Sequence, residues 1–425
     1  MKIIHYCLGI PPLATGGLTI YANSLAKIQS KDNEVIIIYP GYKKNKIHLK
    51  FIKKENNIKI YRLDGALPVS LTYGVKNPLE FIKNKDLKEI EDEFNKLSHF
   101  DILHLHTIQG IYPEILKYFK ENNTKIIFTT HDFYPFSLTT KLYEDNELNI
   151  KNNIIQSLKA PNSNALYLNR RPFINKLKKI KFIKKIFNKK IKENNEIKYD
   201  LEYEKDYINK SNKLYDYYKN MFKFIDVIHA NSNISMDIYS KIHNNIKVLP
   251  ISHEKIMMHD LKKNEDNILR IGFFGEQIKE KGFDLLLNKL DLIYENNNNF
   301  ILNTYGHSNL YERPYLKYKG SYKLDDLEEI YKNLDVVIFP TINLESFGFV
   351  VLEALSYNTP VIVSKNVGAK DLCNPNYILN NEEELDIILK KIINNKSVLS
   401  TYFDYDLKII NFIEHNEEII DKIYK

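Results

Sequence analysis

Apolar runs that suit buried β-strands alternate with helical periods along most of this 425-residue chain, and they form two separate sets. In the first half, segments with helical spacing separate KIIHYCL, EVIIIYP, DILHLH and KIIFTTH. In the second half, ILRIGFFG, FILNTYG, DVVIFP and PVIVS repeat the pattern. Continuous apolar strands separated by helices are typical of parallel sheets covered on both faces. The sequence therefore predicts two doubly wound α/β domains, each binding ligands at the carboxyl ends of its strands.

The length of the chain exceeds what one ordinary hydrophobic core supports, which also favours two domains. We place their boundary in the polar, aperiodic segment 250–267, giving a first domain over 1–250 and a second over 251–404. Residues 405–425 are expected to form a terminal helix, for which packing back on the first domain is one arrangement. Residues 138–220 fit neither set of strands, and we interpret them as a helical insertion in the first domain.

The formal net charge of +7 is concentrated in one place. Residues 170–192 contain eleven basic residues and no acidic one, and subtracting these eleven charges from +7 leaves −4 for the rest of the chain. This distribution argues against a nucleic-acid-binding protein, whose basic residues spread over a whole face. The segment also has apolar residues at helical spacing, so it predicts a basic amphipathic helix. Such a helix either lies on an anionic membrane or packs on its own domain.

The chain contains two cysteines, which suits a reducing compartment better than a disulfide framework. No run approaches the roughly 20 apolar residues that a membrane span requires. The opening MKIIHYCLGIPPL has a proline pair and no small-residue cleavage site, so we interpret it as a first strand and not as a signal peptide. We therefore expect a cytoplasmic protein.

Two glycine-containing turns are candidate anion sites. Gly16 and Gly17 stand between the first strand and the first helix, where backbone N–H groups can face a phosphate, although a plain tight turn explains the pair equally well. There is no complete G-x-G-x-x-G, so a dinucleotide site is poorly supported. Lys281 follows the first strand of the second domain and can reach an anion above the sheet. An ordinary surface lysine is the alternative.

Three histidines stand at strand ends in the first domain. His104 and His106 are two residues apart in DILHLH and so point to one face of the strand, and His131 ends KIIFTTH. One interpretation is a metal cluster of the hydrolase type. The other is a polar crevice lined by histidines, which we favour because no further ligand recurs with matching spacing.

The stretch ESFGFVVLEAL places two carboxylates, Glu345 and Glu353, in an otherwise apolar run. Glu345 is expected in a strand-to-helix turn and Glu353 two helical turns further, so they lie at most roughly 12 Å apart. Carboxylates suit pairs of sugar hydroxyls, and the amides of Phe347 and Gly348 at the helix start would face a diphosphate. Alternatively, Glu345 favours the helix dipole and Glu353 pairs with a lysine. The binding interpretation requires that internal ion pairs do not use up both side chains.

Taken in order, these motifs resemble a known family. GG before the first helix, THD at a strand end, FFG…KG opening the second domain and ESFGFVVLEAL are similar to the family-4 retaining glycosyltransferases of GT-B fold. The resemblance covers most of residues 1–135 and 222–425, and its most specific element is the E-x7-E of Glu345 and Glu353. It implies two Rossmann-like domains that face each other across a cleft.

The resemblance also implies roles for individual residues. In the second domain, Glu345 would bind the transferred hexose, Glu353 the ribose and Lys281 the diphosphate. In the first domain, Gly17 would approach the phosphate and His131 the reacting sugar. We take His131, Glu345 and Lys281 as the catalytic set and name no nucleophile. The other positions that match the donor site are Gly16, Gly275, Gly320, Ser321, Tyr322, Ser346, Phe347 and Gly348.

By the same resemblance, the donor is a UDP- or GDP-hexose and neither a metal nor a cofactor is needed, because lysine and helix amides stabilise the departing diphosphate. The acceptor would be a glycan or a lipid-linked sugar of surface polysaccharide synthesis, which suits a peripheral place at the inner face of the cell membrane. Two departures stand out: Glu276 replaces the usual arginine, and LPISHE replaces the usual Asn-Gly after the last strand of the first domain. Two rival functions are a non-catalytic GT-B partner subunit and a metal-dependent hydrolase that uses His104, His106 and His131.

Overall fold

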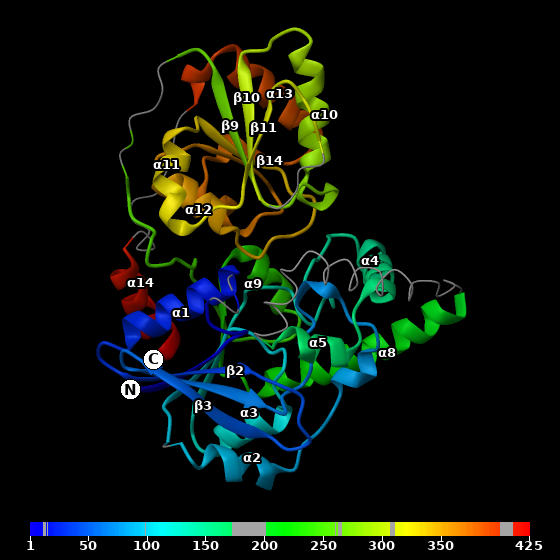
Figure 1. The fold of residues 1–425 in the computed structure, drawn as a ribbon, viewed down its shortest axis with the longest axis vertical. Helices are drawn as coiled ribbons and strands as arrows, with labels where there is room; N and C mark the ends of the chain where they lie inside the picture. The colour runs from blue at the N-terminus through cyan, green and yellow to red at the C-terminus, as the bar shows by residue number, and fades with distance from the viewer. Residues whose placement is uncertain are drawn as a thin grey trace. The chain divides into compact units, whose positions relative to one another are not determined.

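The computed structural model divides the chain into two compact units (Figure 1). The first comprises Met1–Ala230, Ser235–Leu249 and Glu418–Lys425, and the second comprises Asn231–Ile234 and Pro250–Glu417. Each unit contains one sheet with helices on both faces. The residues that the structure describes are 1–11, 14, 16–97, 99–171, 201–259, 261, 266–306, 311–399 and 411–425.

The sheet of the first unit has eight strands among the described residues, in the order β3-β4-β2-β1-β5-β6-β7-β8. The strands are β1 (Lys2–Tyr6), β2 (Glu34–Pro40), β3 (His48–Glu55), β4 (Ile58–Asp64), β5 (Ile102–Leu105), β6 (Lys125–Thr129), β7 (Val227–Ala230) and β8 (Ile246–Val248). All neighbouring strands are parallel except β3 and β4. The central strands are almost wholly buried because helices cover both faces, as their unbroken apolar sequences predict.

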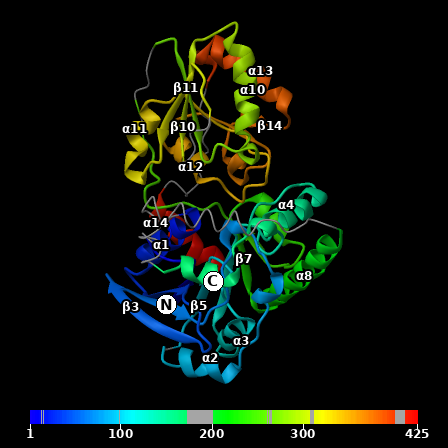
Figure 2. The same ribbon diagram turned by 45° about the vertical axis from the view of Figure 1, so that its right-hand side comes forward.

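The helices of the first unit are α1 (Gly17–Gln29), α2 (Leu87–Phe94), α3 (Pro113–Glu121), α4 (Asn146–Lys159), α5 (Ser163–Asn169) and α8 (Leu201–Lys219), and α9 (Asn233–Tyr239) begins at the division between the units. Figures 1 and 2 show α1 on one side of the sheet and α2 and α3 on the other. The helical turn Ile419–Tyr424 returns to the first unit and packs against β6.

The predicted insertion, residues 138–220, contains α4, α5 and α8 in its described part. Residues 172–200 lie outside the described residues, so nearly all of the basic amphipathic helix predicted over 170–192 lies outside them too. The same holds for residues 400–410, in the segment before the predicted terminal helix. Within the part of the chain that the structure describes, no helix combines the length and apolar character needed to cross a membrane.

The sheet of the second unit has six parallel strands among the described residues, in the order β11-β10-β9-β12-β13-β14. The strands are β9 (Leu269–Phe274), β10 (Phe300–Tyr305), β11 (Leu316–Gly320), β12 (Val336–Phe339), β13 (Val361–Ser364) and β14 (Ile378–Leu379). The helices are α10 (Phe283–Tyr294), α11 (Leu327–Lys332), α12 (Phe349–Ser356), α13 (Glu382–Asn394) and α14 (Phe412–Glu418). This strand order confirms the prediction of a second doubly wound domain.

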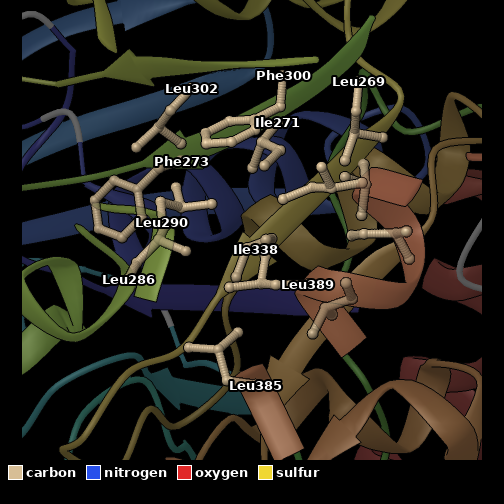
Figure 3. Close-up of a cluster of buried hydrophobic side chains, with 14 of the residues drawn as sticks. Leu269, Ile271, Phe273, Leu286, Leu290, Phe300, Leu302, Ile338, Leu385 and Leu389 are labelled. Carbon is tan, nitrogen blue, oxygen red and sulfur yellow. The ribbon is translucent and has the colours of Figure 1, made fainter. Parts of the chain in front are cut away.

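The core of the second unit fixes the sheet against two of its helices. Figure 3 shows side chains of β9, β10 and β12 packed against Leu286 and Leu290 of α10 and Leu385 and Leu389 of α13. Helices α11 and α12 lie on the opposite side of the sheet (Figures 1 and 2). Burying each of these large apolar side chains contributes about 1.5–3 kcal/mol. The sheet is thus held rigidly from both faces, and so are the loops at the carboxyl ends of its strands.

Candidate functional site

The turn that carries Lys281 lies against the loop after β12. Gly282, which follows Lys281, has φ +72°, and a Cβ atom there would lie 2.0 Å from the backbone oxygen of Pro340. Only glycine permits this close approach. The amide of Ile342 also donates a 2.9 Å hydrogen bond to the backbone oxygen of Glu280. The sequence Lys-Gly therefore fixes Lys281 beside the loop that leads from β12 to α12.

That loop holds Glu345 by its backbone on both sides. The amide of Glu345 donates to the oxygen of Asn366 at 2.8 Å, and the oxygen of Glu345 accepts from the amide of Gly368 at 3.0 Å. The side chain of Glu345 forms an ion pair with Lys281, and both side chains are 22% exposed. The structure thus brings together two of the three predicted catalytic residues at the carboxyl end of the sheet.

Glu353 lies on α12 and is only 4% exposed. Its Oε1 atom is 3.5 Å from Nε2 of His253, which is fully buried. Nδ1 of His253 accepts a 3.3 Å hydrogen bond from the amide of Lys255, and Nε2 has no hydrogen-bond partner within the described residues. Within the described residues, the second oxygen, Oε2, has no hydrogen-bond partner. A buried carboxylate oxygen without a partner costs free energy, which is what a site for a hydroxyl-bearing ligand would relieve.

Both carboxylates therefore have a neighbour inside the unit, an outcome that the sequence interpretation named as counting against it. The partner of Glu353 is a histidine, whereas the alternative named from the sequence was a lysine. Glu345 has the lysine instead. An ion pair with this much exposure contributes only about 0.2–1 kcal/mol, so a ligand with its own charges can open it. Each carboxylate thus has a neighbour in the unit, and the weak pair with Lys281 leaves Glu345 available to a ligand.

The next donor-site candidates of the second unit lie at the carboxyl ends of β9 and β11. Gly275 follows β9 with φ +119°, and a Cβ atom there would meet no atom of the described residues within 4 Å. Gly320 ends β11, and Tyr322 lies edge-on to Phe274 with ring centroids 5.5 Å apart. Burial, followed by the negative charge of Glu353, raises the pKa of Tyr322.

The loop between Glu345 and α12 contains the amides at the start of that helix. Gly348 caps α12 in a left-handed conformation, with φ +100°. The backbone amides of Phe347 and Gly348 donate no hydrogen bond within the described part of the chain. Ser346 lies in the same loop, and Ser321 is exposed beside Tyr322. Two unpaired amides at a helix N-terminus favour an anion, and the carboxyl end of the sheet is where such a ligand binds in doubly wound folds.

The candidates of the first unit lie at the carboxyl end of its own sheet. Gly16 caps α1 and is exposed, and Gly17 begins the helix. A Cβ atom at Gly16 would meet no atom of the described residues within 4 Å. His131 follows β6, and its Nε2 is 3.2 Å from Nδ1 of His106. The rings of His104 and His106 stack with centroids 4.2 Å apart, which confirms that they share one face of the sheet.

Burial makes these histidines weaker bases than a free imidazole. Burial lowers the pKa of His131 to about 3, and burial followed by repulsion from neighbouring histidines lowers the pKa values of His104 and His106 well below 6.5. Among the described residues, His5, His104 and His106 offer ring nitrogens within 4.8 Å of one another, a group that is close enough to hold a metal ion. This group includes His5 and not His131, so it differs from the set that the sequence suggested.

Comparison with known proteins gives a family match within the second unit. Residues 267–394, which include Lys281, Glu345 and Glu353, match the family of group 1 glycosyl transferases. An uncharacterized glycosyltransferase of Methanocaldococcus jannaschii is 30% identical over 118 residues, which are 25% of this chain and 30% of that relative. The chain therefore spans less than a third of the length of the curated relative that it matches.

Solved structures resemble the whole chain. Sucrose-phosphate synthase from Thermosynechococcus elongatus has a TM-score of 0.55 at 12% identity, covering 100% of this chain and 95% of its own. The trehalose-6-phosphate protein from E. coli bound with UDP-2-fluoro glucose has a TM-score of 0.56 at 12% identity, covering 100% and 99%. HepE from Anabaena in complex with UDP-glucose has a TM-score of 0.51 at 12% identity, covering 100% and 96%.

The protein therefore has the two-domain GT-B fold, as the sequence predicted. The family match is confined to residues 267–394 of the second unit, and membership of the whole chain in the glycosyltransferases is a proposal. The assignment to family 4 stays a prediction.

Proposed function

We propose that the protein is a glycosyltransferase that moves a hexose from a nucleotide-diphosphate sugar to a glycan or lipid-linked acceptor. The observation that carries the proposal is the buried Glu353, whose Oε2 has no hydrogen-bond partner in the described part of the chain. A vicinal pair of ribose hydroxyls donates two hydrogen bonds to one carboxylate and would supply the missing partner. His253 lies beside this carboxylate, with its Nε2 3.5 Å from Oε1.

In this proposal, Lys281 and Glu345 separate and bind different parts of the activated sugar. The diphosphate is more negative than a single carboxylate, so Lys281 turns from Glu345 to the phosphate oxygens. Glu345 is then released to accept hydrogen bonds from hydroxyls of the hexose. The amides of Phe347 and Gly348 contact the diphosphate from the start of α12. Until the donor arrives, the ion pair keeps both side chains close to their working positions.

The chemical step depends on stabilising the negative charge of the leaving diphosphate. When the bond from the sugar to the phosphate breaks, negative charge grows on the leaving diphosphate, and Lys281 and the helix amides stabilise it. We propose that the reaction retains the anomeric configuration by front-face attack, with a leaving-phosphate oxygen taking the acceptor proton. Retention, the hexose and independence from metal ions rest on the family-4 resemblance. Glu276, which is exposed where that family has an arginine, leaves Lys281 as the principal cation.

The choice between a uridine and a guanosine donor is also a proposal. We favour a UDP-sugar because two structures similar to this one were solved with UDP-glucose or UDP-2-fluoro glucose. A non-catalytic partner subunit would not need Lys281, Glu345 and Glu353 in this arrangement. A hydrolase built on His104, His106 and His131 does not explain why residues 267–394 match group 1 glycosyl transferases.

A thermal-shift panel tests the proposal. We expect UDP, GDP and their hexose conjugates to differ, with the correct nucleotide at 100 times its Kd raising the melting temperature of the second unit by about 5–10 °C. The matching sugar nucleotide should then be slowly hydrolysed, or transferred to an acceptor, with the same rate in a strong chelator. If none of the nucleotides changes the melting temperature and none is consumed, the protein is not a transferase. If a chelator abolishes the activity, the hydrolase gains support.

We further propose that the protein is cytoplasmic and binds anionic membranes through residues 170–192. Arg170 belongs to the first unit, where it donates hydrogen bonds to the backbone oxygens of Leu8 and Pro40, so deleting the whole segment would damage the fold. Changing the nine lysines of 176–192 to glutamine avoids this damage. We expect the wild type to sediment with anionic vesicles and the variant to stay in the supernatant, since each basic residue contributes about 1 kcal/mol. Equal binding of both proteins at moderate salt would contradict the proposal.

A further inference from the structure

The five arginines of the sequence differ in their partners. Three of them form an ion pair with an aspartate, in the pairs Arg62–Asp64, Arg270–Asp266 and Arg313–Asp291. The other two, Arg170 and Arg171, are adjacent, and neither forms an ion pair with a carboxylate of the described residues. An exposed arginine without such a partner is common, but a guanidinium withdrawn from water needs a counter-charge. Arg170 is therefore the residue that requires an explanation.

The guanidinium of Arg170 joins the carboxyl ends of two neighbouring strands of the first sheet. Its Nε donates a 2.9 Å hydrogen bond to the backbone oxygen of Pro40, the last residue of β2. Its Nη2 donates at 2.8 Å to the oxygen of Leu8, two residues after β1. Burial lowers the pKa of this guanidinium, which nevertheless stays charged at neutral pH. A positive charge thus lies at the sheet edge where doubly wound domains bind ligands.

The short helix α5 fixes the position of this guanidinium. Arg170 caps the C-terminus of α5, and its amide donates to the oxygen of Tyr167 at 3.3 Å. The hydroxyl of Tyr167 donates at 2.7 Å to the oxygen of Ala66, in the loop after β4. Nζ of Lys43, after β2, donates at 2.8 Å to Oδ1 of Asn164 in α5. The helix is tied to two loops of the sheet, so Arg170 is in place before any ligand arrives.

The hydrogen bonds to the two strand ends use only one edge of the guanidinium. Of its five N–H groups, Arg170 uses one on Nε and one on Nη2. Nη1 donates no hydrogen bond to any residue in the described ranges. The edge formed by Nη1 and Nη2 therefore keeps two parallel N–H groups, which is the arrangement that binds two oxygens of one anion. Arg170 is also partly exposed.

The carboxylate of the adjoining loop does not supply the missing negative charge. Asp64, which is fully buried, accepts from Nε of Arg62 at 2.7 Å and from the amide of Tyr42 at 3.0 Å. Nζ of Lys44 lies 3.5 Å from the same carboxylate. Asp64 is thus shared between two cations already. The guanidinium carbon of Arg171 lies 5.4 Å from the centroid of the Tyr42 ring, so a second cation without a carboxylate borders this loop.

We propose that Arg170 and Arg171 form a binding site for a phosphate group at the carboxyl end of the first sheet. The open edge of Arg170 matches two oxygens of one phosphate. A phosphate monoester carries nearly two negative charges at pH 7, which suits two arginines, whereas a carboxylate carries only one. The assignment of this phosphate to the acceptor of the sugar rests on the proposed function. The binding of a phosphate does not.

NMR of the arginine Nε–H groups tests the site in the full-length, isotope-labelled protein. None of the residues assigned to the donor site is an arginine, since Glu276 stands where the family-4 resemblance implies one, so these signals do not report on that site. The probes are inorganic phosphate, glucose 6-phosphate and dihexanoylphosphatidic acid below its micellar concentration. We expect saturable shifts of Arg170 and Arg171, while the three arginines with an aspartate partner keep their positions.

The two monoesters distinguish the possible sources of the phosphate. If glucose 6-phosphate saturates the shifts at the lower concentration, the site is built for a sugar phosphate. If the phosphatidic acid does so, it is built for a phosphorylated lipid. If none of the three probes shifts Arg170 and Arg171, or if all five arginines shift alike, the proposal is overturned.

Arg171→Gln separates binding from folding, because the Arg171 side chain is exposed and makes no hydrogen bond within the described part of the chain. We expect the Kd for the phosphate probe, followed at Arg170, to rise about ten-fold, as for the loss of a charged hydrogen bond. Arg170→Lys keeps the charge but loses the paired donors, and we expect at least the same rise, followed at Arg171.

Lys159→Gln is the matched control, because it removes an exposed positive charge from α4, the helix before α5. It should bind the phosphate probes as the wild type does. An equal rise of the Kd in Lys159→Gln and Arg171→Gln would indicate only a general attraction of anions and would contradict the site.

Kinetics connect the site to the acceptor. With a phosphorylated acceptor that is turned over, Arg171→Gln should raise the KM for that acceptor about ten-fold and leave the KM for the donor nearly unchanged. A rise in the KM for the donor instead would contradict the assignment to the acceptor. If no transfer is found at all, the proposed function fails, and the NMR titration still decides whether the site binds phosphate.

Discussion

Replacing Lys281 with methionine is expected to lower kcat for sugar transfer by about two to three orders of magnitude, the usual effect of removing one group that stabilises developing negative charge. Methionine keeps the length and apolar stem of the side chain but removes the charge that neutralises the leaving diphosphate. The effect should be large because the principal cation beside Glu345 is lost and Glu276 adds no positive charge. The measurement is steady-state turnover at saturating donor, with folding checked by thermal unfolding.

The matched control for this substitution is Lys279→Met. Lys279 lies in the same helical turn as Lys281 but is exposed, so it should tolerate the change with less than about a threefold effect, as is usual for an exposed charge. Near-normal turnover in Lys281→Met would contradict the assignment of this lysine to the diphosphate. A similar loss in both variants would point to a general electrostatic effect of the whole turn.

The second large effect is expected at Glu353. Glu353→Gln keeps the size of the side chain but removes the charge, and we expect the Kd for the nucleoside diphosphate to rise about 10- to 150-fold, as for the loss of a charged hydrogen bond. Because the proposal assigns this carboxylate to the ribose, the change should depend on the ribose hydroxyls. Calorimetric titration with the ribonucleotide and its 2′-deoxy analogue measures this dependence.

The wild type should discriminate strongly between the two nucleotides, and Glu353→Gln should bind both with similar, weak affinity. Glu383→Gln is a suitable control, since Glu383 is an exposed glutamate in the first turn of α13. If Glu353→Gln weakens both nucleotides by the same factor, the carboxylate does not contact the hydroxyl that differs between them. The unpartnered Oε2 would then need another explanation.

The sequence predicted the architecture because that information is local. Unbroken apolar strands such as EVIIIYP and DVVIFP indicate burial on both faces, and a strand buried on both faces in an α/β sequence is parallel. Glu345 and Glu353 were found for the same reason, since eight residues of one turn and one helix define their separation. The turn formed by Lys281 and Gly282 was also identified from adjacent residues alone.

The partners of these residues could not be predicted, because they depend on contacts between distant segments. His253 pairs with Glu353 across 100 residues, and nothing near LPISHE indicates this. The sequence analysis named His104, His106 and His131 but missed His5. A signal existed: His5 and His104 are paired in the register of β1 and β5, but the register follows only from the assembled sheet.

The limits of the two units also depend on contacts between segments that are distant in the sequence. The composition of the sequence places one boundary at residue 250. In the structure, Asn231–Ile234 belongs to the second unit and Glu418–Lys425 to the first. Such a division is a property of tertiary contacts, and it leaves no local change in polarity. Tyr424 illustrates the consequence, since its ring is buried among residues of α1 and β5.

The return of the chain to its first sheet has a consequence for biosynthesis. Gln29 and Tyr424 are 395 residues apart, and a ribosome that adds about 5–20 residues per second needs roughly 20–80 seconds to make the intervening chain. Throughout this time, the nascent amino-terminal half lacks the segment that packs against His104 and Gln29. The first half to be translated is therefore the last to be finished, and it reaches its final state only after the second half has been made.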